Sequence, residues 1–318
     1  MDEPTPRLTF IRKLDERFDP RQDHARAADA GAETRVSWGV YASVNDWRAA
    51  TDDQQYLLRI AAIAGTRNSR PVFSHYSAAA IHGLPIVGRW PMEVHTTVGP
   101  TVGGRSRNGV VKHHAKLPAE DVVEVGGFLV TSVARTVIDL AMTMSFRDAV
   151  IAADRALLVD RFGRVGPMTT KQEVQATLER LMPVRAHKRC QRVIDFGVHL
   201  SGSTLESTSR VSMFLGHCPR PELQLSYYDY QGFIGDSDFS WPKYGTLGEA
   251  DGAAKYFDPR YRSGRTPEQV INDERIRHNR LVALPRVVIR WGWDIGTSPT
   301  RMRAHLANGG LPVDVPWL

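Results

Sequence analysis

The chain has 318 residues, of which 42% are hydrophobic and 24% are charged, so a collagen-like, low-complexity or disordered protein is excluded. Its net charge is +6, which suits a nucleic-acid partner but is equally expected of a chain from an arginine-rich proteome. Two cysteines, Cys190 and Cys218, are too few for a disulfide framework, and the charged N-terminal segment lacks the apolar core of a secretion signal. We therefore expect a cytoplasmic protein with reduced thiols and no membrane partner.

The first predicted region, about residues 1–70, combines short helices with one strand. Helical patterns cover 11–18 and 21–30, and the second of these ends at a glycine. A strand is expected over 36–41, followed by a longer helix over 44–63 whose apolar residues recur at helical spacing.

The second predicted region, about residues 71–198, alternates strands and helices before it becomes helical throughout. The expected elements are a helix (77–82), strands (92–98, 110–114 and 128–131), a helix that starts at 133, a helix from 145 to 158, a helix that starts at a Thr170–Glu173 capping box, and a basic helix near 185–192.

The third predicted region begins after a glycine-bounded linker at 197–202 and is taken as 199–318. Its expected elements are a helix (203–216), three strands (222–229, 232–240 and 246–251), a helix (267–283), a strand (286–291) and a helix (298–307). The whole chain is thus expected to be a multidomain protein of the α+β or α/β class.

Three carboxylates are expected to converge in the third region. Asp238 lies near the end of one predicted strand, and Glu249 and Asp251 lie on the next, across a short turn at 241–245. Alternate side chains of a strand share a face, so pairing across that turn would bring Asp238 close to Glu249. Crowded carboxylates repel one another, and a divalent cation such as Mg²⁺ or Mn²⁺ would relieve the repulsion. Such an ion also activates water for phosphodiester hydrolysis.

The third region resembles the PD-(D/E)XK nucleases, in particular a bacterial domain of uncharacterised function related to very-short-patch-repair endonucleases. The residues that carry the resemblance, within about 200–295, are Glu206-Ser207, Arg210, Asp238-Phe239-Ser240-Trp241, Glu249-Ala250-Asp251-Gly252, Lys255-Tyr256, Glu274-Arg275 and Arg290-Trp291. The resemblance implies a restriction-endonuclease-like αβββαβ domain in which Asp238 and Glu249 hold the metal ion.

The resemblance also implies roles for nearby residues. The lysine that the family has two residues after its glutamate is Asp251 here, and Lys255, four residues further on, is the expected substitute. Glu206 would hold a second ion or the attacking water, and Lys255 or Arg210 would stabilise the charge on the phosphate. The candidate catalytic residues are therefore Asp238, Glu249, Asp251, Lys255 and Glu206.

Several of these residues also fit ordinary structural roles. Glu206 with Ser203 forms a capping box, and Arg210 follows Glu206 at the i,i+4 spacing of a helical ion pair. Arg275 and Arg277 could grip a phosphate backbone or could line a solvated helix face.

Residues 35–160 resemble the AbiEi-type antitoxins, which are DNA-binding regulators of toxin–antitoxin systems. The matching segments are Trp38-Gly39-Val40-Tyr41, Ser74 to Pro85 and Thr131 to Ala141. The resemblance implies an N-terminal winged helix, although only two short helices fit before Val40 and no recognition helix stands out. Arg105, Arg107 and Lys112 to Lys116 form a second basic cluster, which could contact phosphates or be a solvated hairpin tip.

Two functions follow as hypotheses. The first is a DNA-binding protein whose C-terminal domain is a Mg²⁺- or Mn²⁺-dependent endonuclease. The second is a non-catalytic, antitoxin-like regulator with a vestigial nuclease fold. A weaker third option is a module that holds a protein toxin through the apolar helices at 132–182. The sequence has no phosphate-binding loop and no dinucleotide fingerprint, and a metal site among its histidines is not expected.

Overall fold

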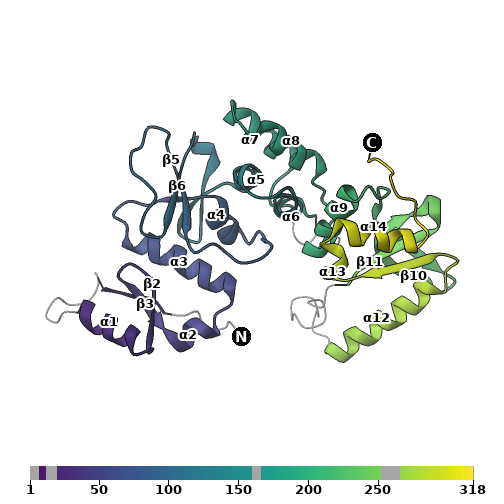
Figure 1. The fold of residues 1–318 in the computed structure, drawn as a ribbon, viewed down its shortest axis with the longest axis horizontal. Coiled ribbons are helices and arrows are strands. Elements are labelled where there is room, and N and C mark those ends of the chain that lie inside the picture. Colours follow the sequence, from purple (N-terminus) through teal and green to yellow (C-terminus); the bar gives the residue numbers. More distant parts are fainter. Residues whose placement is uncertain (1–6, 12–19, 160–165, 252–265, 318) are drawn as a thin grey trace. The chain divides into compact units, whose positions relative to one another are not determined.

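The computed structural model describes residues 7–11, 20–159, 166–251 and 266–317 (Figure 1). The chain divides into two compact units, the first made of residues 1–157 and 167–197 and the second of residues 158–166 and 198–318. The described residues form three sheets with helices around them, so the predicted mixed α and β, multidomain class is confirmed. Within the described part of the chain, no helix has both the length and the apolar character needed to cross a membrane.

The N-terminal part of the first unit is a three-stranded antiparallel sheet with helices beside it. Its strands, in spatial order, are β1 (Thr9–Phe10), β3 (Val40–Ser43) and β2 (Glu33–Ser37), and its helices are α1 (Pro20–Asp29), α2 (Val44–Ala49) and α3 (Asp52–Thr66). The helix expected over 11–18 falls almost entirely outside the described residues.

Two predictions in this part are wrong. The single strand over 36–41 is instead the β2–β3 hairpin, in which Trp38 and Gly39 form the turn and Gly39 has a φ of 69° that side chains rarely adopt. The single helix over 44–63 is two helices, because the Thr51 hydroxyl accepts the Gln54 N–H while the Gln54 side chain accepts the Thr51 N–H. This capping box starts a new helix at a point where the apolar spacing alone continues.

The rest of the first unit is a five-stranded sheet with a layer of helices. The strands, in spatial order, are β6 (Val110–His114), β5 (Val94–Val98), β4 (Val72–Phe73), β8 (Phe128–Thr131) and β7 (Val122–Val125). The helices are α4 (His75–His82), α5 (Val133–Thr143), α6 (Phe146–Leu157), α7 (Lys171–Leu181) and α8 (His187–Phe196). Tyr56, Phe73, Val94 and Val130 lie in its core. The predicted capping box of Thr170 and Glu173 is confirmed.

The charged residues of the 131–141 segment belong to a buried ion network. Arg135 is 1% exposed, and its guanidinium donates to Asp139 at 2.8 Å, to Asp121 at 3.1 Å and to the Lys116 carbonyl at 2.8 Å. Arg180 also donates to Asp121, from α7. The network joins α5, α7 and the turn before β7, so the polar residues of this segment link separate elements of the first unit.

The apolar faces of the helices at 132–182 are used inside the first unit. Val137, Ile138 and Leu140 of α5 are at most 2% exposed, and Ala149 to Ala153 of α6 and Leu178 of α7 are equally buried. The helices therefore do not present these faces as a surface for a toxin, because α5 packs against α4, α6, α7 and α8.

The second unit is a four-stranded sheet with helices on both faces. Its strands, in spatial order, are β12 (Val287–Trp291), β11 (Thr246–Ala250), β10 (Gly232–Trp241) and β9 (Glu222–Asp229); β11 and β12 are parallel and the other pairs antiparallel. Its helices are α9 (Thr204–Leu215), α12 (Pro267–Val282), α13 (Trp293–Gly296) and α14 (Pro299–Asn308). All the elements predicted here are confirmed to within one residue at each end, and α13 was not predicted.

Alternation along the strands gives the sheet two distinct faces. One face packs Tyr227, Ile234 and Leu247 against Leu281 of α12. The other packs Phe239, Trp241 and Trp291 with residues of α9 and α14 (Leu205, Met302 and Leu306). Side chains therefore alternate between the two faces along each strand. Within 238–241 of β10 the even-numbered residues face α12, as do the odd-numbered residues of β11, and the others face α9 and α14.

Candidate functional site

Asp238 and Glu249 lie level with each other on neighbouring strands of the second unit. Antiparallel pairing joins Phe239 to Gly248, so the next step outward along both strands brings Asp238 opposite Glu249. Both side chains share the sheet face of Leu247, which α12 covers, and both are buried, with 8% and 4% of their surface exposed. The structure thus brings together the two carboxyl groups expected to hold a metal ion.

Arg277 of α12 reaches Glu249 with both ends of its guanidinium. Nη1 donates to Glu249 Oε2 at 2.9 Å, and Nη2 donates to Oε1 at 3.1 Å. Nη2 also donates to the Asp236 carbonyl at 2.6 Å, which ties the arginine to β10. The sequence left open whether Arg277 contacts a phosphate backbone or lines a solvated helix face, and in the structure its guanidinium is instead paired with the buried Glu249 carboxylate.

Glu249 binds a proton more tightly than an ordinary glutamate does. Burial, first, and then the charges of Asp238 and Glu274 raise the pKa of the Glu249 carboxyl to about 7, although Arg277 opposes the rise. Asp238 is tied at the same place, since its Oδ2 accepts the N–H of Ala250 at 2.8 Å. The negative charge of the two carboxyl groups is therefore offset by the Arg277 guanidinium and the Ala250 N–H, and the raised pKa of Glu249 reduces that charge further.

Asp251 belongs to a second arginine. Arg290 of β12 donates to Asp251 Oδ2 at 2.7 Å and to Oδ1 at 2.6 Å, so Asp251 is paired with Arg290 and not with Arg277. Glu274 accepts from Arg277 at 3.1 Å and from Arg290 at 3.2 Å, and so links the two ion pairs. We call this group the acid–arginine network: Glu249, Glu274 and Asp251 pair with Arg277 and Arg290, and Asp238 adds its charge beside Glu249.

Glu206 and Arg210 have structural positions on α9, which packs against the opposite sheet face. Glu206 accepts the Gly202 N–H at 2.8 Å and the Ser203 hydroxyl at 2.8 Å, so its carboxylate caps the start of its own helix. Arg210 is 4% exposed, and a side chain that is buried to this extent is not presented to a phosphate at the surface. For Glu206 the structure shows the capping contacts that the sequence also allowed.

The other predicted contact residues are surface cations. Arg275 is exposed on α12 and donates to Asn272, and Arg105 and Arg107 are exposed in the loop before β6. Lys255, the expected replacement for the missing lysine, lies outside the described residues.

The residues present do not fit a divalent cation in this arrangement. Both Glu249 oxygens accept from Arg277, and a metal ion bound to them would lie against a like charge at hydrogen-bond distance. Among the described residues, no three histidine, cysteine, aspartate or glutamate side chains are grouped in a way that could hold a metal ion. In this structure the cation beside Glu249 is the Arg277 guanidinium.

A histidine cluster in the first unit was not foreseen. The rings of His75 and His113 stack with centroids 3.5 Å apart, and His95 Nδ1 is 2.9 Å from His113 Nε2. The three histidines come from α4, β5 and β6, so no spacing along the chain indicated their contact. His75 Nδ1 also lies 3.8 Å from Asp139 Oδ2, a buried oxygen without a hydrogen-bond partner among the described residues.

The cluster predicts that acid destabilises the first unit. Burial, and then repulsion from His113, lowers the pKa of His95 to about 4. The pKa of His75 is lowered by burial and then by His113, His95 and Arg135, and the pKa of His113 is lowered by burial and then by His114. A depressed histidine pKa means that the folded state resists protonation, so stability is lost as pH falls below about 6.5 towards 4. We expect a loss of about 2 kcal/mol from His95 by pH 4.5.

Hydrogen exchange of the β5 and β6 amides, measured from pH 7 to 4.5, checks this. The His95→Gln/His113→Gln variant should lose part of the pH dependence, whereas a His187→Gln control should keep it. The pKa of Asp139 is raised to about 6, so protonation of this carboxyl stabilises the first unit as pH falls. This opposing effect is the same in the unmodified protein and in both variants. Equal pH dependence in all three would contradict the assignment.

Comparisons with known proteins do not identify a family for this chain. No family model matches the chain, and no curated protein matches it. Among solved structures, the crystal structure of the RV2827C protein from Mycobacterium tuberculosis is similar over 72% of this chain and 85% of its own, at 12% sequence identity and a TM-score of 0.41.

Proposed function

We propose that this protein binds nucleic acid and that its second unit is a nuclease-like domain in which Arg277 stands where a catalytic metal ion would lie. The observation that carries the proposal is the two-pronged contact of Arg277 with Glu249, at 2.9 and 3.1 Å. An arginine paired in this way neutralises the carboxylate but supplies no bound water for attack on phosphorus. The domain would therefore hold nucleic acid without cutting it.

The arrangement of the second unit supports the nuclease-like part of the proposal. Helix α9, the β9–β10–β11 meander, helix α12 and strand β12 follow the αβββαβ order of a restriction-endonuclease-like domain. The acid pair lies on the hairpin where that resemblance expects it. The first unit, with its β2–β3 hairpin and basic loop, would be the regulator-like DNA-binding part.

A metal-dependent endonuclease is the second candidate, and one observation favours it. In the acid–arginine network, four carboxyl groups face only two guanidinium groups, so negative charge remains beside Asp238. Mg²⁺ or Mn²⁺ would be drawn to that charge if Arg277 moved away.

Binding and cleavage assays separate the two candidates. We expect the protein to shift a DNA duplex at low salt, with an affinity that falls steeply between about 50 and 200 mM salt, and to leave supercoiled plasmid uncut in Mg²⁺ or Mn²⁺. Arg107→Ala and Arg275→Ala should each reduce the salt dependence by about one phosphate contact, and Arg301→Ala, on the other sheet face, should not.

Two outcomes would count against the proposal. Absence of any DNA shift at low salt would remove nucleic-acid binding. Metal-dependent nicking that disappears in Asp238→Asn would favour the endonuclease instead.

A further inference from the structure

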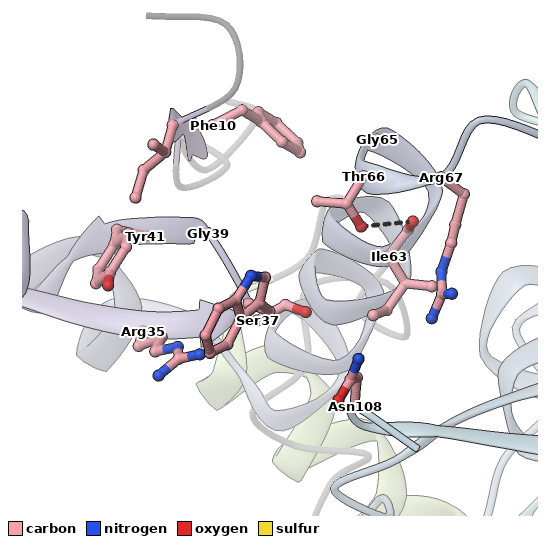
Figure 2. A pocket seen from close by; sticks show the side chains of 12 residues that line it. Phe10, Arg35, Ser37, Gly39, Tyr41, Ile63, Gly65, Thr66, Arg67 and Asn108 are labelled. Carbon is pink, nitrogen blue, oxygen red and sulfur yellow. Dashed lines mark hydrogen bonds between the residues drawn. The ribbon is translucent and has the colours of Figure 1, made fainter. Parts of the chain in front are cut away.

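A cavity of about 360 Å³ lies in the first unit beside the β2–β3 hairpin (Figure 2). The hairpin forms one wall with Arg35 and Trp38, and the C-terminal end of α3 forms another with Ile63 and Arg67. Asn108, from the loop before β6, closes a third side. Phe10 and Ile11 complete the lining, so four segments that are separate in sequence surround a space large enough for one small planar ligand.

Trp38 is an exposed part of the cavity wall. It lies at the tip of the hairpin, and 74% of its surface is accessible. The Arg35 guanidinium lies over its ring, 4.6 Å from the centroid. The cation covers one face of the indole ring, and the opposite face can stack against an aromatic ring of a ligand.

The cavity lining combines positively charged, polar and apolar side chains. Arg35 and Arg67 are on opposite sides of the space in Figure 2, and none of the twelve lining residues, all within the described part of the chain, is acidic. Asn108 adds an amide that can both donate and accept, and Phe10 and Ile63 add apolar surface. A ligand that matches these groups has a flat aromatic body, polar edges and a negative charge, which together describe a nucleotide.

We propose that this cavity binds one nucleotide unit, with its base against Trp38, its phosphate at Arg35 or Arg67, and a base edge at Asn108. The inference rests on the proposed nucleic-acid binding and specifies its substrate. A base inside a duplex is stacked and must be extruded at a cost before it can enter such a cavity, whereas single-stranded nucleic acid presents its bases freely. The first unit therefore prefers single strands, or free nucleotides, to duplex.

Binding of a labelled single-stranded oligonucleotide, its duplex and competing AMP tests the proposal on the full chain. Trp38→Ala should weaken single-strand binding about tenfold or more and change duplex binding little, because each stacked base contributes strongly to single-strand affinity. Arg67→Ala should weaken it as well. Met92→Ala, which removes another exposed apolar side chain of the same unit (70% exposed), is the matched control and should change neither.

The outcomes are distinguishable. Competition by AMP would assign the cavity to free nucleotides, and its absence, with the Trp38 effect present, to a nucleotide within a strand; both support the proposal. An equal loss of single-strand and duplex binding in Trp38→Ala would overturn it, since the hairpin would then contact duplex, and the proposed function would stand. No change in Trp38→Ala while DNA still binds would also overturn it. Only failure of every nucleic acid to bind would remove the proposed function as well.

Discussion

Arg135→Ala is expected to destabilise the first unit by about 3–5 kcal/mol, the range typical of breaking a buried ion pair from one side. The substitution would leave Asp121 and Asp139, both 0% exposed, without the guanidinium that donates to each of them. Small domains are stable by only about 5–15 kcal/mol, so a loss of this size is a large share of the stability of the first unit. Denaturant unfolding followed by hydrogen exchange in β7, β8 and α5 measures the loss.

Arg147→Ala is the matched control for this prediction. Arg147 pairs with Asp148 at 3.2 Å on the neighbouring helix α6, but 35% of its side chain is exposed. Solvent screening keeps such pairs weak, so the expected change is within about 1 kcal/mol. Equal effects of the two substitutions would show that the buried network does not hold α5 in place.

The second large effect is expected at Arg277. Arg277→Ala would leave Glu249 buried beside Asp238 with no cation, and we expect the second unit to lose about 3 kcal/mol at neutral pH. The loss should shrink as pH falls, because the pKa of Glu249 is already raised to about 7 and protonation removes the unpaired charge. Thermal unfolding from pH 8 to 5 follows both effects.

Two further variants test the cause of that loss. Arg277→Ala/Glu249→Gln should recover part of the stability, since the uncompensated charge is gone. Arg280→Ala, one turn further along α12, breaks the pair with Asp229 at the sheet edge and should have a smaller, pH-independent effect. A pH-independent loss in Arg277→Ala would mean that the arginine acts through packing alone.

Local signals in the sequence predicted the second unit well. Each strand of the hairpin has a run of alternating residues with a short turn between them, and that turn sets the register which places Asp238 opposite Glu249. Glu206 likewise has its partner three residues away, so its capping role was one of two readings that the sequence allowed.

Contacts between distant segments were not predictable in the same way. Arg277 meets Glu249 across 28 residues, and its spacing from Glu274 showed only that the two share a helix face, not which way that face turns. The histidine cluster needs α4, β5 and β6 to be in place before any contact exists. The break before α3 differs, since the Thr51–Gln54 capping signal is local, but the apolar spacing continues across it and by itself predicts one helix.

Mn²⁺ binding to the unmodified protein, measured by electron paramagnetic resonance at neutral pH, tests the central claim most directly. With Arg277 occupying both oxygens of Glu249, the protein and its Glu249→Gln variant should leave the same amount of Mn²⁺ free, and Arg277→Ala should bind one additional ion. One ion bound per unmodified chain and released by Glu249→Gln would contradict the account, because the acid pair would then hold a metal and not the arginine.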